Sequence, residues 1–370
     1  MTGRHTAQHS AQPTERRARR AGRSRQPAWL LAIYDILLTG LVLCVFATSH
    51  HVIPRMNAAK MEPPKPTSIL SPSAQPAQSQ TERPAEESAP VENTPAPTPE
   101  VIDNRTEWQK KFEEHFTDEI VRTDNTYTSP DVSITISTVT VGEGGYSSQC
   151  HIADIYIAQI ENFQTYFATG SYGYYASQSA LGIDRDSDAL ISINGDYCNN
   201  QTSGFLVRNG ELYYTEQTSN DICVLYRDGT MATFGPGDYV VDEQLQKEPW
   251  QVWKFGPRLL DANGAPISDF NTSKEIKWEN PRSGVGYYEP GHYCFVVVDG
   301  RQNGYSRGLT MDEFAQLFAD LGCKAAYNLD GGASAVMTFN DAEYSHPSNG
   351  GRDLGDALLI KEIDKAEGEK

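Results

Sequence analysis

Three short polar motifs stand where apolar runs of the sequence end, and their residue types could carry out chemistry. They are residues 194–196 (Asn-Gly-Asp), 299–301 (Asp-Gly-Arg) and 328–334 (Asn-Leu-Asp-Gly-Gly-Ala-Ser). In the third motif Asn328 and Asp330 straddle one apolar residue, so in an extended chain both side chains point to the same side. The two glycines that follow allow a ligand to approach the backbone closely. Carboxylate, amide and hydroxyl groups gathered in this way are typical of a catalytic or binding site.

Each motif also has a simpler interpretation. Asn, Asp and Gly are the usual residues of tight turns, because they tolerate positive φ angles or hydrogen-bond to nearby backbone. The first two motifs taken alone are typical of turns, whereas the density of polar residues and glycines in the third favours a functional site. A turn without further function remains the alternative for all three.

Strands are the elements expected to position these motifs. Alternating or apolar runs predict strands at residues 132–136, 151–160, 189–193, 293–298, 324–329 and 357–360. Tight hairpins with type I′ turns are expected at Asn209-Gly210 and Asp228-Gly229. The clearest helix is predicted over residues 311–321, where Thr310 and Glu313 can form a capping box. Because strands outnumber helices, the sequence predicts an α+β domain, with mixed β-sheets and flanking helices, over residues 131–365.

The N-terminal region has a different composition. Residues 1–27 carry seven Arg and one Glu, and residues 28–49 are apolar apart from Asp35. A helix of this length crosses the hydrocarbon of a bilayer, and basic residues stay on the cytoplasmic side. We therefore predict a basic cytoplasmic tail, a single transmembrane anchor that contacts the membrane, and a cell-membrane location with the C-terminal domain outside. A cleaved signal peptide is the alternative.

Between this apolar run and the domain, residues 50–100 hold 11 of the 21 prolines together with many Ser, Thr, Gln and Glu. Such a segment buries little apolar surface, which predicts a disordered linker. Residues 101–130 are expected to form a helix and a connection. Large apolar residues four apart make the helical stripe: Trp108, Phe112, Phe116 and Ile120. The stripe predicts packing on the following domain, and a dimerising stalk helix is the alternative.

Five motifs in one order resemble the phosphodiester glycosidase family. They are, in chain order, SINGDYCN, FGPRLLDANG, NPRSGVGY, NLDGGASAVM and GGRDLGDALLI. The resemblance extends over about residues 150–362. Two positions depart from the family pattern: Ala333 stands where a third glycine is usual, and Asp356 stands where Asn is commoner. A Cβ at position 333 could narrow the pocket and so change the substrate.

The resemblance implies hydrolysis of the bond between a sugar anomeric carbon and a phosphodiester oxygen, in cell-surface or host glycans. The leaving phosphate is a stable anion that needs charge neutralisation, and arginine binds phosphate oxygens in a fork. Arg282 in the NPRSGVG segment is the first choice for this role, followed by Arg301 and Arg352. The substrate partner is thus a carbohydrate phosphodiester. A net charge of −18 argues against nucleic acid.

The sugar develops oxocarbenium character in this reaction, and a carboxylate either stabilises it or attacks it. Asp330 is the expected carboxylate, with Asp299 and Asp196 as acid/base or water-positioning partners. The remaining groups of the motifs are expected to hold sugar hydroxyls or phosphate, through the side chains of Asn194, Asn328 and Ser334 and a backbone nest at Gly331 and Gly332.

No cofactor is required for this chemistry. The side-chain oxygens of residues 194, 196, 299 and 330 could bind Ca²⁺, although no EF-hand spacing is present, so a metal site stays open. The sequence leaves the oligomeric state open as well. A non-catalytic module that binds phosphorylated glycans on the same fold is the alternative function.

Overall fold

The computed structural model describes residues 28–48, 64–69, 103–200 and 203–363. The chain divides into two compact units, Met1–Asn57 and Ala58–Lys370. The predicted basic tail over residues 1–27 and most of the predicted linker over residues 50–100 lie outside the described residues.

The first unit contains one described helix, α1 (Ala28–Ala47). Among the described residues no helix combines the length and the apolar character that a membrane crossing needs. The predicted transmembrane anchor over residues 28–49 is therefore wrong, and so is the part of the predicted architecture that placed such a helix before the domain.

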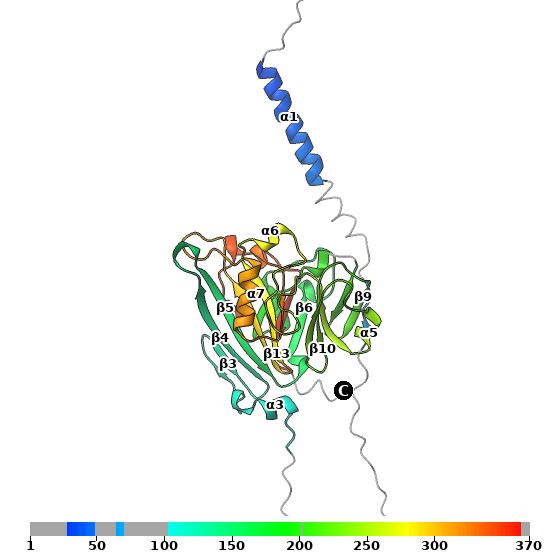
Figure 1. Cartoon of the computed structure of the whole chain (residues 1–370), viewed down its shortest axis with the longest axis vertical. Helices are drawn as coiled ribbons and strands as arrows, with labels where there is room; N and C mark the ends of the chain where they lie inside the picture. The colour runs from blue at the N-terminus through cyan, green and yellow to red at the C-terminus, as the bar shows by residue number, and fades with distance from the viewer. Residues whose placement is uncertain (1–27, 49–63, 70–102, 201–202, 364–370) are drawn as a thin grey trace, which may run out of the picture. The chain divides into compact units, whose positions relative to one another are not determined.

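The second unit is built from three antiparallel sheets with few helices, which confirms the α+β domain (Figure 1). The seven-stranded sheet has the order β15 (Ala325–Asn328), β13 (Arg282–Glu289), β14 (His292–Val298), β5 (Ser148–Ile157), β4 (Val132–Val141), β3 (Thr126–Thr128) and β2 (Val121–Arg122). The five-stranded sheet has the order β17 (Ala342–Glu343), β16 (Met337–Phe339), β7 (Ile191–Asn194), β18 (Asp356–Ile360) and β6 (Phe163–Phe167). Strands predicted from alternation are present in both.

The third sheet has six strands, in the order β1 (Thr67–Ser68), β9 (Glu211–Thr215), β8 (Phe205–Arg208), β12 (Pro249–Trp253), β10 (Ile222–Tyr226) and β11 (Met231–Phe234). Its first strand belongs to the stretch that the sequence assigned to the disordered linker. Thr67 pairs with Leu212 and Ser68 with Glu211, so this piece of the linker region is ordered against the domain.

One core joins the three sheets. Apolar side chains of every sheet meet in it, among them Ile134, Ile193, Trp253, Phe295 and Leu358. All of these side chains are at most 1% exposed, as expected for strands covered on the inner face. The sheets therefore form one packed body.

The helices are short: α3 (Glu107–Lys111), α4 (Ala180–Ser187), α5 (Val241–Leu245), α6 (Lys274–Lys277) and α7 (Met311–Asp320). The longest of these five, α7, has the predicted capping box between Thr310 and Glu313. Its Phe314 packs closely over β13, because a Cβ on Gly284 would come within 3.0 Å of the Phe314 ring. This packing places the start of β13, and thus Arg282, beneath the loop that precedes α7.

Two local expectations need correction. The helix predicted over residues 101–122 is only α3 followed by a 3₁₀ turn at Glu113–His115, because the backbone leaves the helical region at Phe112, whose side chain is buried.

Of the two predicted hairpins, the one at Asn209-Gly210 has the predicted turn, since both residues have positive φ angles. The second hairpin has a four-residue loop over residues 227–230, in which only Gly229 has a positive φ.

Candidate functional site

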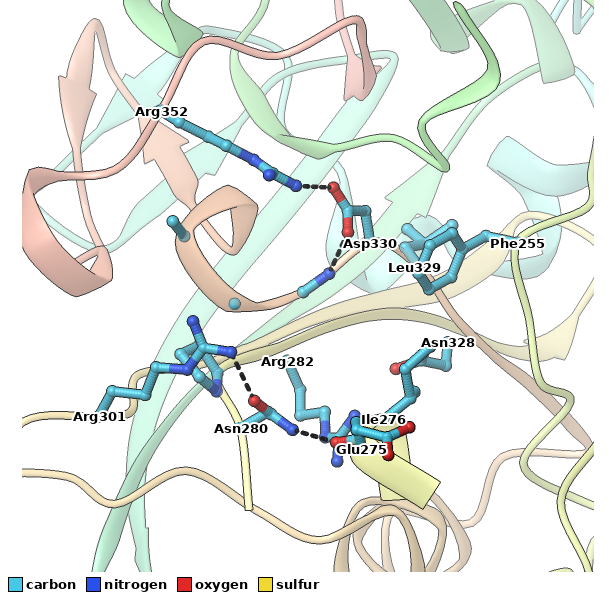
Figure 2. Close-up of a pocket in the computed structure, with 14 residues that line it drawn as sticks. Phe255, Glu275, Ile276, Asn280, Arg282, Arg301, Asn328, Leu329, Asp330 and Arg352 are labelled. Carbon is cyan, nitrogen blue, oxygen red and sulfur yellow. Dashed lines mark hydrogen bonds and ion pairs between the residues drawn. The ribbon is translucent and has the colours of Figure 1, made fainter. Parts of the chain in front are cut away.

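A cavity of about 350 Å³ opens where β13 begins and β15 ends (Figure 2). These two strands are neighbours, with Gly284 paired to Asn328, so residues at their ends are held side by side. The lining consists of Phe255, Glu275, Ile276, Asn280, Pro281, Arg282, Arg301, Asn328, Leu329, Asp330, Gly331, Gly332, Ala333 and Arg352. The structure thus brings the three predicted arginines and most of the third polar motif into one cavity.

Arg282 is a buried cation in the wall of this cavity, only 2% exposed. Its Nε donates to the carbonyl of Leu309 at 2.9 Å, and its Nη2 donates to the carbonyl of Trp278 at 2.5 Å. Both partners are neutral, and within the described residues no carboxylate forms an ion pair with it. Burial, and then the charge of Arg301, lowers the pKa of Arg282 to about 10. A bound anion would compensate this desolvated charge.

Arg301 is the second cation of the cavity and has a left-handed backbone, with φ of 58°. Its Nη2 donates to Oδ1 of Asn280 at 2.7 Å. Gly332 lies against its guanidinium group, and a Cβ there would come within 3.2 Å of both Nη atoms. This glycine is therefore needed to leave room for Arg301.

The backbone groups of the glycine pair are already engaged. The N–H of Gly331 donates to Oδ1 of Asp330 at 2.9 Å, and the N–H of Gly332 donates to the carbonyl of Pro281 at 3.0 Å. The structure therefore does not offer these two N–H groups to an anion as the expected nest. The glycines instead allow close packing, since a Cβ on Gly331 would lie 2.7 Å from the Pro281 carbonyl oxygen.

Asp330 is held in a fixed orientation at the cavity. Its Oδ2 accepts from Ser334 Oγ and from Arg352 Nη2, both at 2.6 Å. The Arg352 guanidinium in turn lies 5.6 Å above the ring of Tyr197. Arg352, expected as a phosphate ligand, is thus an ion-pair partner of Asp330, and Ser334 also contacts the carboxylate.

The two asparagines have different surroundings. Asn194 is buried; its Nδ2 donates to the backbone carbonyl of Asp330 at 2.6 Å, and its Oδ1 accepts from Ser283 Oγ at 2.5 Å. Asn328 donates to the carbonyl of Gly256 at 2.8 Å, while its buried Oδ1 has no donor among the described residues. A buried acceptor without a partner is costly. Asn328 therefore lines the cavity with a buried acceptor that has no donor among the described residues, whereas Asn194 supports the Asp330 loop.

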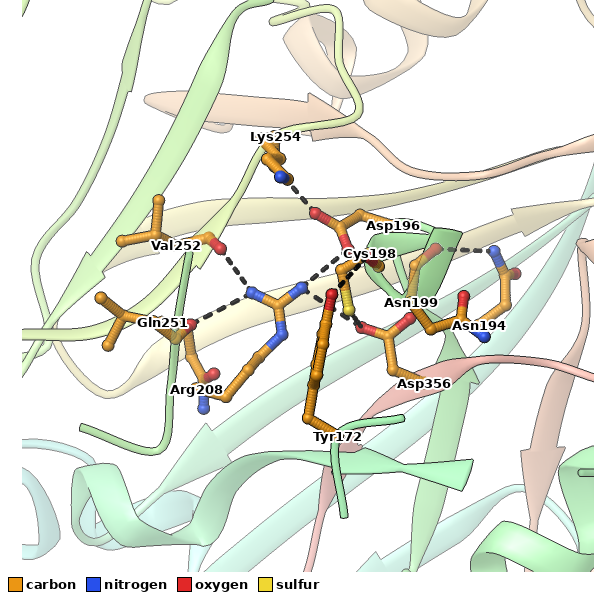
Figure 3. Close-up of polar contacts among 12 residues, drawn as sticks. Tyr172, Asn194, Asp196, Cys198, Asn199, Arg208, Gln251, Val252, Lys254 and Asp356 are labelled. Atoms are coloured by element: carbon orange, nitrogen blue, oxygen red, sulfur yellow. Dashed lines mark hydrogen bonds and ion pairs between the residues drawn. The ribbon is translucent and has the colours of Figure 1, made fainter. Parts of the chain in front are cut away.

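Asp196 does not reach the cavity, contrary to its predicted catalytic place. It is fully buried, and its Oδ1 accepts from Arg208 Nη2 at 2.7 Å (Figure 3). Its Oδ2 accepts from the backbone N–H of Lys254 at 2.8 Å. Arg208 also pairs with Asp356 at 3.2 Å. Burial, and then the charge of Asp196, raises the pKa of Asp356 to about 6. This is a buried ion-pair network that holds the 194–196 turn.

Asp299 also lies outside the cavity lining. Its buried carboxylate is 2.9 Å from His151 Nε2 and accepts from the hydroxyl of Tyr305 at 2.8 Å and from the backbone N–H of His346 at 2.9 Å. Burial alone would raise the pKa of this carboxyl group, but these contacts outweigh it and hold the pKa below its usual range. Because residues 196 and 299 lie in separate clusters, the four oxygen donors expected for Ca²⁺ do not come together.

The lining residues that the sequence interpretation missed include Phe255, Glu275 and Asn280. Phe255 and Asn280 begin two of the quoted family motifs, which was a usable signal. Glu275 lies in α6 with no local pattern to mark it. Hydrogen bonds at the start of this short helix lower the pKa of Glu275, so it adds a second carboxylate to the cavity.

Comparison with known proteins finds a matching family. A family model described as phosphodiester glycosidase matches residues 187–361. The SPbeta prophage-derived uncharacterized protein YomE of Bacillus subtilis (strain 168) is 27% identical over 200 residues, which cover 52% of this chain and 31% of that protein. The chain thus spans about a third of the length of this curated relative.

A solved structure shares the fold. The zebrafish N-acetylglucosamine-1-phosphodiester α-N-acetylglucosaminidase catalytic domain, auto-inhibited by its pro-peptide, superposes with a TM-score of 0.53 at 21% identity. The superposition covers 66% of this chain and 88% of that chain. All lining residues of the cavity fall inside the matched segment. Residues 187–361, with the cavity that they enclose, therefore belong to the phosphodiester glycosidase family.

Proposed function

We propose that this protein is a glycosidase that hydrolyses the bond between the anomeric carbon and the phosphate oxygen of a sugar-1-phosphodiester. One observation carries the proposal. Arg282 and Arg301 have no carboxylate partner among the described residues, and they line the cavity that also contains Asp330 (Figure 2). A phosphodiester supplies the anion that these cations lack, and its sugar carbon can then face the carboxylate.

The reaction needs little proton transfer to the leaving group. As the C1–O bond breaks, negative charge grows on the departing phosphate monoester, and the two guanidinium groups stabilise it. Positive charge grows on the sugar ring, where the carboxylate of Asp330 stabilises it or attacks C1. Water then supplies the new C1 oxygen, and the carboxylate of Glu275, which also lines the cavity, can accept the proton that the water loses.

The free acceptor of Asn328 extends the proposal to the sugar. Asn328 lines the cavity, and its buried Oδ1 lacks a donor among the residues described. A sugar hydroxyl is a donor of the right size and polarity. That the diester belongs to a cell-surface or host glycan, met outside the cytoplasm, is part of the proposal and rests on the sequence alone.

A second candidate is a binding module for phosphorylated glycans that performs no turnover. The contacts of Asp330 favour it, since Arg352, Ser334 and the Gly331 N–H already use both carboxylate oxygens. A carboxylate committed in this way could serve only to shape the cavity. The two candidates share the anion site and differ in whether Asp330 reacts.

The deciding experiment incubates the full chain with a panel of sugar-1-phosphodiesters, beginning with an α-GlcNAc-1-phosphodiester, and measures the free sugar released. We expect turnover by the wild type and a loss of at least ~10³-fold in the Asp330→Asn variant. Asp320→Asn, at an exposed carboxylate at the end of α7, is the matched control and should retain full activity. Binding without turnover, unchanged in Asp330→Asn, would establish the binding module instead.

A further inference from the structure

A second cluster of chemically competent side chains lies outside the cavity. His151 on β5, Asp299 after β14 and His346 in the loop after β17 come from distant parts of the chain. The Nε2 of His151 is 2.9 Å from Oδ2 of Asp299, and the Nδ1 of His346 is 3.5 Å from the same oxygen. All three potential ligand atoms lie within 4.8 Å of one another. None of the three residues lines the proposed active-site cavity.

The charge balance of this cluster is incomplete. The Asp299 side chain is 1% exposed, and among the described residues neither Lys nor Arg pairs with it. A buried carboxylate is normally compensated by a cation. Here Oδ2 has two imidazole rings and the hydroxyl of Tyr305 around it, while Oδ1 accepts a backbone N–H. The polar atoms therefore converge on one oxygen.

Further contacts hold the His151 ring and the His346 backbone in place, as outer contacts do for metal-binding histidines. The Nδ1 of His151 is 3.0 Å from Oγ1 of Thr138 on β4, which fixes the ring with Nε2 toward Asp299. Both backbone groups of His346 make hydrogen bonds. The N–H of His346 donates to Oδ1 of Asp299, and the carbonyl of His346 accepts from Gln302 Nε2 at 2.7 Å. Outer contacts of this kind orient ligand rings and raise metal affinity.

We propose that His151 Nε2, Asp299 Oδ2 and His346 Nδ1 bind one zinc ion, with water or the Tyr305 hydroxyl as the fourth ligand. In tetrahedral zinc sites the donor atoms lie roughly 3.3 Å apart, which the separations of 2.9 and 3.5 Å approach. Two imidazoles and one carboxylate favour zinc over Ca²⁺ or Mg²⁺, which prefer oxygen ligands. The proposal is independent of the reaction assigned to the cavity.

The ion would have a structural consequence for the cavity. Asp299 is two residues before Arg301, and the loop of His346 contacts the same turn through Gln302. Zinc would therefore fasten this turn to β5 and hold Arg301 in its left-handed conformation. His151 and His346 are positioning residues in this scheme, since they do not line the cavity.

The test uses the untagged full chain, freed of metal with a chelator and titrated with ZnCl₂ by calorimetry, with bound zinc counted by elemental analysis. We expect one zinc per chain and at least ~100-fold weaker binding in His151→Ala and in His346→Ala. Thr138→Val should weaken binding roughly 10-fold, as an outer contact does. Because the His346 side chain is 67% exposed, its variant should fold like the wild type, which circular dichroism checks.

His292→Ala is the matched control. His292 is also on the seven-stranded sheet and pairs with one carboxylate, Asp154, at 2.7 Å, but it belongs to neither of the potential metal-binding groups found among the described residues. The His292→Ala variant should bind zinc like the wild type. Co²⁺ bound to the wild type should give the visible spectrum of a tetrahedral site, and this spectrum should disappear in His346→Ala. Absence of zinc binding, or binding unchanged in His151→Ala and His346→Ala, overturns the proposal. Zinc binding that is lost only in Cys198→Ser also overturns it, because Cys198 belongs to the second potential metal-binding group, Asp196, Cys198 and Asp356.

Discussion

Arg352 donates from Nη2 to Oδ2 of Asp330 at 2.6 Å, although the two residues are 22 positions apart in the chain. The ion pair orients the carboxylate that the proposed reaction places next to the sugar. The Arg352 side chain is 47% exposed and that of Asp330 is 14% exposed, so the pair contributes little to folding but defines the geometry of the cavity.

This contact predicts how Arg352→Ala should change the kinetics. Asp330 loses one of its orienting donors, so kcat should fall by about 100-fold while KM changes little. A phosphate ligand would behave differently, because its removal would mainly raise KM. Steady-state kinetics on the diester that gives turnover distinguish the two roles, and Arg352→Lys should recover part of the lost kcat.

The two unpaired guanidinium groups predict an anion site that can be measured without turnover. Inorganic phosphate should raise the Tm of the wild type, since a ligand that binds only the folded state stabilises it. Arg282→Lys should abolish this rise and lower kcat/KM by about 100-fold or more, because an ammonium group cannot replace the fork of the guanidinium.

Arg227→Gln is the control for that measurement. Arg227 pairs with Glu161 at 3.0 Å on the surface and lies outside the cavity lining. Its phosphate response should equal that of the wild type. An equal rise of Tm in Arg282→Lys would contradict the anion site.

Gly332→Ala should harm activity beyond its cost in stability. Gly332 has φ of 64°, and a Cβ there would press on the Arg301 guanidinium at 3.2 Å. We expect a loss of about 1 kcal/mol in the free energy of unfolding and a clear loss of kcat/KM. Gly322→Ala is the matched control, because Gly322 also has a positive φ, of 81°, but a Cβ there would meet only open space. Urea unfolding should show similar losses for both, with activity retained in Gly322→Ala.

The buried pair of Asp196 and Asp356 predicts a pH-dependent stability. Burial, and then the charge of Asp196, raises the pKa of Asp356 in the folded chain to about 6, from the 3.8 of an unperturbed aspartate. A raised carboxyl pKa means that the folded state binds the proton more tightly than the unfolded state. The stability contributed by this proton is present below about pH 4 and is lost as the pH rises to about 6.

Asp356→Asn removes this loss, because the amide carries no charge at any pH. The variant should match the wild type near pH 4 and be clearly more stable than the wild type at pH 8. Urea unfolding at both pH values measures the difference. A stability difference that is the same at pH 4 and pH 8 would show that burial of this carboxylate is not the cause.

Local patterns were sufficient for several parts of the fold. The capping box at Thr310, the positive φ angles of Asn209-Gly210 and the apolar run of β14 are properties of neighbouring residues, and each has the predicted structure. The apolar periodicity of residues 101–122 wrongly predicted one continuous helix. The helix ends at the buried Phe112, and Ile120, the last residue of the predicted apolar stripe, is 63% exposed. Hydropathy also failed for the anchor expected over residues 28–49.

The sequence by itself determined which polar residues end strands and therefore which residues are candidates for the site, among them Asp330 and Arg282. Only the tertiary structure decided which of them face the cavity. Asp196 follows its strand much as Asp330 does, but Arg208 from another sheet neutralises it in the core, while Asp299 is enclosed by His151 and His346. The fate of a carboxylate depends on the charges that packing brings within a few ångströms of it, and those charges come from distant parts of the chain.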